Sequence, residues 1–333
     1  MKGEKTNRDR SMTKRICHSR KRSASGILPE ERFRTSRNDG QTGLSLAPFT
    51  NRSGMALVLV LMIVALITAM VVEFAYGVYV NTNALHNWQT SQKLSIAAKS
   101  ATRLASKLIG SPQDAFMKDL YTKGVLQISQ KIPFEDLDGT IALRIEDENA
   151  KFNLNSLKNP DGYAFFVRLL TVLDLDPDIA NIVSYWINAS TDHRPKNSGG
   201  IQPKDAYMDS VDELLLIPGV DKKSYDRLLP YVTIYGSGNS DSNTFFINVN
   251  TADIPVIRSL ADNTSEDLAA RIISYRPLTS LQAVPDVPMG FGAGHTTYRG
   301  NAFHVIATAE SGGIRRIVES VLEGNTVKYW KEM

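Results

Sequence analysis

The chain has 333 residues but only one cysteine, Cys17, which lies in a basic N-terminal stretch. Residues after Gly54 therefore carry no thiol, which excludes disulfide bonds, cysteine nucleophiles and thiolate metal sites from that part of the chain. The sequence also lacks the HExxH, GxSxG, GxGxxG and Walker motifs. Its five histidines are scattered, with no pair at metal-ligand spacing. We therefore expect no enzymatic activity.

Charge is missing from Met55 to Val72, and eighteen uncharged residues at about 1.5 Å each are close to the minimum for crossing a bilayer. Residues 1–54 hold thirteen Lys and Arg against five Asp and Glu, which leaves 25 basic and 30 acidic residues after Gly54. Because basic residues gather on the cytoplasmic side of a span, this predicts a single pass with a cytoplasmic N-terminus and an exported C-terminal part.

Proline is absent from Asn51 to Gly110, and apolar residues recur at helical spacing from Leu94 to Leu108. One helix is therefore expected from the membrane to about Ile109, ended by Gly110 and Pro112, with a length of roughly 80 Å. A secretory signal has a shorter apolar region followed by a cleavage site. An ordinary single-pass anchor with a stalk also fits the pattern.

The junction in "RSGMALVLVLM", a basic segment followed by Gly54 and an apolar run, resembles the prepilin processing site of type IV pilins and pseudopilins. The resemblance implies that a prepilin peptidase cuts between Gly54 and Met55. That family usually carries a glutamate at the fifth mature position, where this chain has Leu59. An unpaired glutamate in hydrocarbon is costly, and a subunit at a filament tip has no neighbour above to pair with it.

The pseudopilin K family of the type II secretion system also lacks this glutamate. The likeness to that family implies that Leu59, Val60 and Ile63 pack against other subunits. A leader of 54 residues is long for a prepilin, so a misplaced start codon and a functional extension both stay open.

The exported part begins with strand-like segments, "VLQISQKI" and the alternating run around Ile141, Leu143 and Ile145. The following "DENAKFNLN" resembles a stretch of the pseudopilin K family. From the residues alone we expect Glu146 to Glu148 to form a solvated turn, and Asn153 and Asn155 to bond to local backbone.

A helical region follows. Asp176 is expected to cap a helix that starts at Pro177, which explains its acidic residues better than an EF-hand does. "ELLLIPGVDKKSYDRLL" indicates a helix-hairpin-helix, with a first helix ending at Ile217 and a turn at Pro218-Gly219. A degraded second copy is expected to have Ser265 as a helix cap.

Two alternating runs flank Gly312-Gly313, which predicts a β-hairpin. The expected fold is α+β: a long N-terminal transmembrane and stalk helix packed on a small antiparallel sheet, with an inserted α-helical domain containing helix-hairpin-helix-like units. The expected parts are a basic leader (1–54), the transmembrane and stalk helix (55–109), the first part of the sheet (110–158), the inserted domain (159–285) and the C-terminal hairpin (286–333).

Relatives in the pseudopilin K family bind calcium in a loop after a Trp-containing helix, and the resemblance offers Asp192, Asp205 and Asp209 as oxygen ligands. Asn188 and Ser190 stand where that family tends to have aspartates, and nearby Arg and Lys residues make the loop basic. Our expectation is therefore that no cofactor binds, with calcium as the one open alternative.

Three functions fit these features. The first, implied by the resemblance, is a non-catalytic minor pseudopilin at the tip of a type II secretion pseudopilus. It would lie in the inner membrane of a Gram-negative bacterium, be cut by the prepilin peptidase, and assemble with minor pseudopilins I and J and other pseudopilins. The second is a membrane-anchored DNA receptor that uses Gly219, Lys222 and Lys223, although the acidic exported part argues against nucleic acid. The third is an anchored sensor.

Overall fold

The computed structural model describes the part of the chain after the leader, with short gaps: residues 52–109, 115–133, 137–195, 202–236, 245–324 and 326–333. The chain divides into two compact units, residues 1–67 and 68–333. The first unit contributes only the start of helix α1 to the described residues. The following paragraphs concern the second unit unless stated otherwise.

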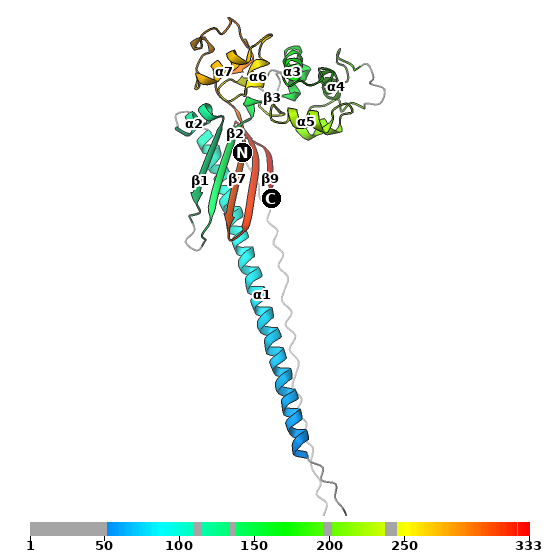
Figure 1. Ribbon diagram of the computed structural model, residues 1–333, viewed down its shortest axis with the longest axis vertical. Helices are drawn as coiled ribbons and strands as arrows, with labels where there is room; N and C mark the ends of the chain where they lie inside the picture. The colour runs from blue at the N-terminus through cyan, green and yellow to red at the C-terminus, as the bar shows by residue number, and fades with distance from the viewer. Residues whose placement is uncertain (1–51, 110–114, 134–136, 196–201, 237–244, 325) are drawn as a thin grey trace, which may run out of the picture. The chain divides into compact units, whose positions relative to one another are not determined.

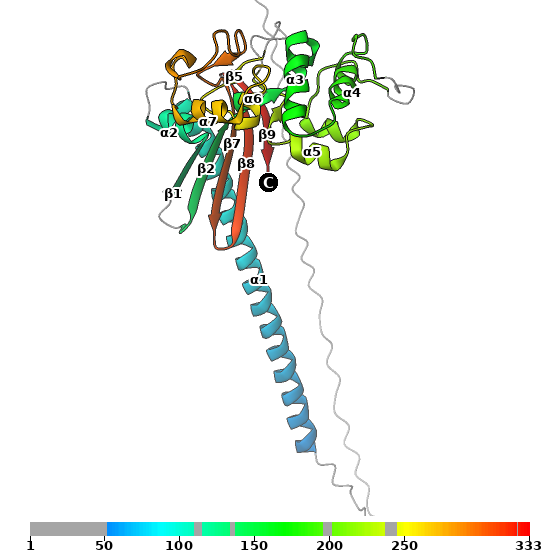
Figure 2. The ribbon, with the colours of Figure 1, turned by 45° about the horizontal axis from the view of Figure 1, so that its top comes forward.

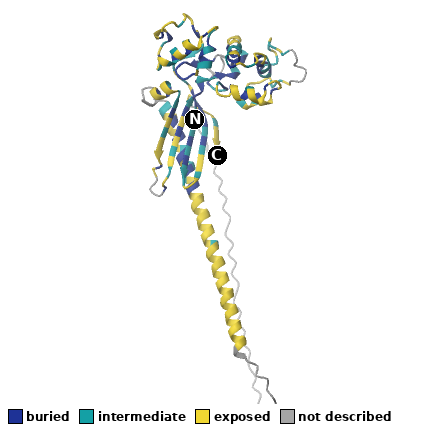
Figure 3. Ribbon diagram, in the orientation of Figure 1, coloured by how far each residue is buried: buried dark blue, intermediate teal, exposed yellow. Residues whose placement is uncertain are grey.

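Helix α1 runs from Arg52 to Ile109, so the predicted single helix and its C-terminal end are confirmed (Figure 1). No proline interrupts it, and every residue from Val78 to Gln89 is exposed. From Thr90 onwards one face of the helix is buried (Figure 3).

A five-stranded antiparallel sheet has the order β1-β2-β7-β8-β9 (Figure 1). Its strands are β1 (Val125–Lys131), β2 (Thr140–Asp147), β7 (Ala302–Ser311), β8 (Ile314–Glu323) and β9 (Thr326–Glu332). The short helix α2 (Ala115–Lys123) leads into β1. Gly312 and Gly313 have φ of 56° and 79° between β7 and β8, as the predicted hairpin requires.

Small side chains let α1 approach the sheet closely. Ala98 and Ala105 are fully buried beside Leu94, in one core with sheet residues such as Val305 and Ala307. Burying a side chain the size of Leu94 contributes about 2 kcal/mol. Most of the predicted helical stripe is therefore the face that docks on the sheet, whereas Leu104, which was predicted to belong to it, is 53% exposed.

We call residues 148–301 the helical block, because between β2 and β7 the chain forms mainly short helices (Figure 2). They are α3 (Pro160–Val172), α4 (Asp178–Ile187), α5 (Lys222–Leu228), α6 (Ile254–Arg258), α7 (Glu266–Ser274) and the 3-10 helices η1 (Glu148–Ala150), η2 (Leu154–Lys158), η4 (Val211–Leu216) and η5 (Leu281–Ala283). Two parallel two-stranded pairs complete it: β3 (Phe152–Asn153) with β4 (Val232–Thr233), and β5 (Ile247–Asn248) with β6 (Thr296–Thr297).

The centre of the helical block is aromatic. Phe152 is fully buried and stacks on Phe165 with ring centroids 4.8 Å apart and on Phe166 at 5.6 Å. Phe245 meets Phe152 edge-on at 5.2 Å. Such pairs contribute about 0.5–1.5 kcal/mol each beyond area burial, so this cluster holds the helices and the short strands together.

Most predicted helix starts are present. Ser265 caps α7 by accepting a hydrogen bond from the Leu268 backbone N–H at 3.1 Å. Asp176 accepts from the Asp178 N–H at 2.9 Å, although helix α4 itself begins one residue later than predicted.

The prediction of an α-helix as the first helix of the helix-hairpin-helix is wrong. Residues Val211 to Leu216 form only a 3-10 helix, and Ile217 is extended. A residue before proline is disfavoured in α conformation, so Pro218 ends the segment before a full α-helix can form. The glycine turn is present, with Gly219 at φ 101°.

The predicted solvated turn at Glu146 to Glu148 is also wrong. Glu146 lies on strand β2, and the next three residues, Asp147, Glu148 and Asn149, are 1%, 4% and 3% exposed. Asp147 continues the inward alternation of Leu143 and Ile145, so its side chain points into the protein.

The Asp147 carboxylate is held by donors from the helical block. Its Oδ2 accepts from the Asn248 amide at 2.5 Å and the Thr251 hydroxyl at 2.8 Å, and its Oδ1 accepts from the Asn149 backbone N–H at 2.9 Å. Burial raises the pKa of Asp147 to about 6, while these hydrogen bonds oppose the rise. The carboxylate thus ties the end of β2 to β5 and the segment that follows it.

Asn149 joins two more segments and also bonds to the residue before β5. Its side-chain Nδ2 donates to the carbonyls of Gly236 and Phe246 at 3.1 and 3.3 Å. Its Oδ1 accepts from the N–H groups of Asn301 and Ala302 at 2.8 and 3.1 Å, where strand β7 begins. Glu148 accepts from the Thr233 hydroxyl and pairs with Lys151 at 2.9 Å. We call residues 147–149 the junction, because they connect both ends of the helical block to the sheet.

The two asparagines after the junction behave differently from each other. Asn153 accepts from the Asn155 backbone N–H at 2.9 Å, as expected. Asn155 instead bonds to a distant backbone, donating to the Met208 carbonyl at 3.1 Å and accepting from its N–H at 2.7 Å. The expectation of local bonding is therefore wrong for Asn155.

The sheet resumes at Ala302, whereas the predicted C-terminal part began at residue 286; residues 286–301 here include β6 and belong with the helical block. Strand β9 was not predicted. It is an edge strand that is exposed on both faces, so its sequence shows no alternation of apolar and polar residues.

The junction generates a pH prediction. The Asp147 carboxyl has a pKa of about 6 in the folded protein and an ordinary value of 3.8 when unfolded. The folded state therefore binds the proton more tightly, and the carboxyl's contribution to the free energy of unfolding falls by about 3 kcal/mol as pH rises from about 4 to above 6. Asp147→Asn, which cannot titrate, should lose this contribution.

Urea unfolding of the two proteins at pH 4 and pH 7, followed by tryptophan fluorescence, measures the effect. The stability of the wild type relative to Asp147→Asn should be greater at pH 4 than at pH 7. The exposed Asp138→Asn serves as the control and should behave as the wild type does. If the free energies of unfolding of the wild type and Asp147→Asn differed by the same amount at pH 4 and at pH 7, the raised pKa of Asp147 would be contradicted.

Candidate assembly site

The largest exposed apolar surface of the described residues is the N-terminal part of α1. All residues from Met55 to Tyr76 are exposed, and none of the most apolar window is buried (Figure 3). Within the described residues this is the one helix long and apolar enough to cross a membrane. Such a surface needs lipid or other helices to cover it.

The predicted processing and assembly residues all lie on this helix. Met55, Leu59, Val60 and Ile63 are 75%, 59%, 54% and 49% exposed. Leu59 and Ile63 are four residues apart and share a face, with Val60 beside Ile63 at a spacing of three. Gly54 has no atom within 4 Å of the place where a Cβ would lie. The geometry leaves these residues accessible, and their roles stay predictions.

Exposed apolar side chains continue beyond the span. Phe74, Tyr79 and Trp88 are 73%, 66% and 60% exposed on the same helix, before its docking face begins at Thr90. Phe74 and Tyr79 follow Glu73 closely, which is typical of aromatic residues at a membrane interface, and this position was the signal that could have identified them. Trp88 lies further along the helix.

The three predicted calcium ligands take different positions. Asp209 pairs with Lys204 at 2.6 Å, and Lys204 also pairs with Glu213 at 2.9 Å. Asp205 accepts from the Ala189 N–H at 2.9 Å, and Asp192 is exposed. The described residues hold no group of three or more His, Cys, Asp or Glu side chains that could bind a metal ion. Residues 196–201 of this loop lie outside the described residues.

Near the helix-hairpin-helix turn, a carboxylate already occupies the start of the second helix. The Asp221 carboxylate accepts from the Ser224 N–H at 2.8 Å, at the start of α5. Lys222 pairs with Asp226 four residues later. A phosphate would meet the Asp221 carboxylate at this helix start, so the geometry does not favour DNA binding by Gly219, Lys222 and Lys223.

Comparison with known proteins supports the sequence resemblance. Two family models described as type II secretion system protein K match residues 150–237 and 247–290. A curated type II secretion system protein K from Pseudomonas aeruginosa is 24% identical over 305 residues, covering 82% of this chain and 89% of the relative. The protein of the same description from Aeromonas hydrophila is 26% identical over 263 residues, covering 68% and 76%.

Over most of its helical block the chain matches the type II secretion system protein K family. The models match the helical block, and the protein K family therefore shares the part of this chain that follows the junction. The predicted resemblance to this family is confirmed.

A solved structure agrees in fold. The crystal structure of a GspK-GspI-GspJ complex from enterotoxigenic Escherichia coli matches with a TM-score of 0.53 and 17% sequence identity, covering 76% of this chain and 97% of the other. The α+β fold, a long helix with an antiparallel sheet and helical insertion, is thus confirmed for this chain.

The loop that carries Asp192, Asp205 and Asp209 gives a prediction about calcium binding. Lys204 neutralises Asp209, and the described carboxylates do not converge, so calorimetric titration with calcium chloride should give no saturable heat up to about 1 mM metal. Saturable heat that disappears in the double variant Asp192→Asn with Asp205→Asn, and persists in the control Asp119→Asn, would show that a site forms here.

Proposed function

We propose that this protein is a minor pseudopilin that closes the tip of the type II secretion pseudopilus. The single observation that carries the proposal is α1. It presents an apolar face without a carboxylate at the fifth position after Gly54, and the helical block later in the chain matches the protein K family. A subunit with Leu59 needs no partner above it to neutralise a glutamate in hydrocarbon.

In this proposal the protein crosses the inner membrane once, with residues 1–54 in the cytoplasm and the sheet and helical block in the periplasm. The match to the protein K family, the apolar span and the opposite charge balance on its two sides support this orientation. The protein acts by geometry and catalyses no reaction. Its α1 packs on the helices of other subunits, and its bulky helical block prevents another subunit from adding above.

The proposed partners are the minor pseudopilins I and J, since the protein with the matching fold was crystallised with GspI and GspJ. Helix pairing through α1 would bury the apolar side chains that are exposed in the isolated chain. The other pseudopilins and the prepilin peptidase are further proposed partners.

Co-purification tests the proposal. The tagged full-length protein, expressed with pseudopilins I and J of its own system, should elute with both. Ile63→Asp should reduce the complex by an order of magnitude or more, because a carboxylate within an apolar helix contact costs about 3 kcal/mol. The control Lys107→Asp, at the far end of α1, should leave the complex intact. A stable wild-type protein that binds neither partner would contradict the proposal.

Processing gives a separate prediction. In cells with an active prepilin peptidase, intact-mass measurement should find a product that begins at Met55. Gly54→Asp should retain its leader, because a side chain at the cut position blocks the peptidase. Gly77→Asp changes the other glycine of α1 in the same way and should be processed normally. An intact leader on the wild-type protein would overturn the processing assignment.

A further inference from the structure

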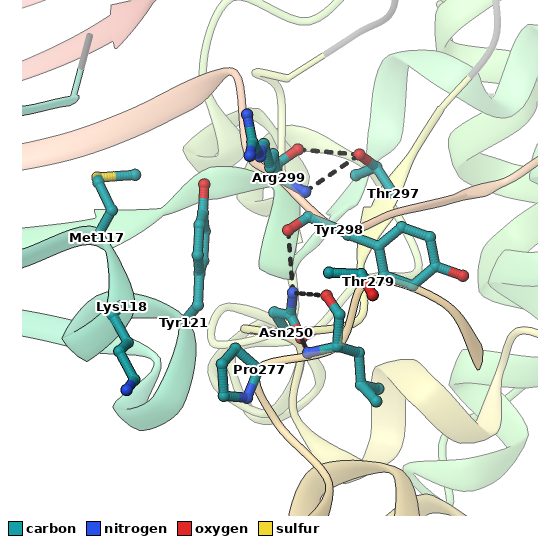
Figure 4. A pocket seen from close by; sticks show the side chains of 10 residues that line it. Met117, Lys118, Tyr121, Asn250, Pro277, Thr279, Thr297, Tyr298 and Arg299 are labelled. Carbon is teal, nitrogen blue, oxygen red and sulfur yellow. Dashed lines mark hydrogen bonds between the residues drawn. The ribbon is translucent and has the colours of Figure 1, made fainter. Parts of the chain in front are cut away.

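A recess of about 620 Å³ lies between helix α2 and the loops at residues 277–279 and 297–299 (Figure 4). Its size falls within the range typical of ligand sites. One wall is helix α2, which leads into strand β1 of the five-stranded sheet, and the other wall belongs to the helical block. No part of the proposed function uses this recess.

The recess is cationic. Lys118 on α2 and Arg299 on the opposite wall line it, and no aspartate or glutamate does. Both side chains are exposed, and within the described part of the chain neither forms an ion pair. Residues 55–333 carry more acidic than basic residues, so the charge of the recess is opposite to that of the exported part as a whole.

Neutral donors and apolar surface accompany the cations. Tyr121 stands between the two walls in Figure 4, and burial together with the nearby Asp147 charge raises its pKa to about 12. Its hydroxyl therefore stays protonated at neutral pH. Thr279 adds a hydroxyl, and Met117 and Leu278 supply apolar surface that suits methylene groups.

The wall of the recess that belongs to the helical block is held in place by hydrogen bonds. Asn250 is buried, and its amide donates to the carbonyls of Leu278 and Tyr298 at 2.9 and 3.0 Å while it accepts from the Leu278 N–H at 2.7 Å. Thr297 donates to the Arg299 carbonyl at 3.0 Å. A recess fixed in this way loses little conformational entropy when it is filled.

We propose that this recess binds an acidic segment of a protein partner, with side-chain carboxylates placed between Lys118 and Arg299. A small free anion would leave most of the volume empty, whereas glutamate side chains bring both carboxylates and methylene groups. Such a segment would contact both helix α2 and the helical block. The proposal does not depend on the tip assignment, since it concerns the chemistry of the recess alone.

Methyl NMR on the full-length protein in detergent micelles tests the proposal at the site itself. Residues 1–54 are basic and also attract acidic peptides, so binding must be read at the recess. With 13C-labelled methionine methyl groups, Met117 reports on the recess and the buried Met208 of the helical block is an internal control. The resonances are assigned with Met117→Leu and Met208→Leu.

The probe is a six-residue glutamate peptide, with six-residue glutamine peptide and succinate as comparisons. We expect the glutamate peptide to shift Met117 saturably and to leave Met208 unchanged, and the glutamine peptide to have no effect. Lys118→Glu with Arg299→Glu should weaken the binding at least about tenfold. The exposed Lys131→Glu, on strand β1, should bind as the wild type does.

The results that overturn the proposal are equally specific. No shift of Met117 with the glutamate peptide would exclude the site. Equal affinity in the charge-reversed double variant, with its Met208 resonance showing a folded protein, would exclude Lys118 and Arg299 as the binding groups. Succinate binding as tightly as the peptide would assign the recess to a small anion in place of a protein segment.

Discussion

The buried polar junction at residues 147–149 is the interaction on which the rest of the second unit depends. The sheet with α1 and the helical block each have a separate apolar core. Hydrophobic burial stabilises each core but is non-directional, so it does not by itself fix one core on the other. The carboxylate and amide groups of Asp147 and Asn149 supply that direction through hydrogen bonds to three separate segments, at residues 236, 246–251 and 301–302.

A buried carboxylate without a cation is costly unless donors surround it. Asp147 receives hydrogen bonds from Asn248, Thr251 and the Asn149 backbone, and Gly300 leaves it the space that a Cβ would occupy. The junction also lies beside both walls of the cationic recess, because Asp147 and Arg299 are both close to Tyr121 of helix α2. The junction thus positions both the helical block and the one recess to which we assign a ligand.

Much of the fold could be predicted because local patterns agreed with the tertiary structure. The absence of proline from Asn51 to Gly110 and the alanine stripe fixed α1, and Gly312-Gly313 marked the hairpin. Asp147 was misread because a run of acidic residues resembles a solvated turn. Its place in the alternation after Leu143 and Ile145 was the signal that predicted burial. The donors for its carboxylate come from residues about 100 positions later, which no local pattern reveals.

For the candidate assembly site, the residues could be predicted from the sequence but their roles could not be established from this chain alone. Gly54, Leu59 and Ile63 were found from the prepilin-like sequence around Gly54 and from the apolar run that follows it. The structure leaves all three exposed. Their roles depend on a peptidase and on other subunits, which lie outside this chain. Lys118 and Arg299 could not be found from the sequence, since they are 181 positions apart and only the packing of α2 beside the helical block brings them to one recess.

The central claim is that one face of α1 packs on the helices of other subunits. Cysteine cross-linking in cells tests it most directly, with single cysteines at successive positions from Met55 to Val72 in a chain with Cys17 replaced by serine. We predict cross-links to a partner pseudopilin that recur every three or four residues, as one helical face requires. Cross-linking that is equal at every position, or that never joins this chain to another pseudopilin, would contradict the account.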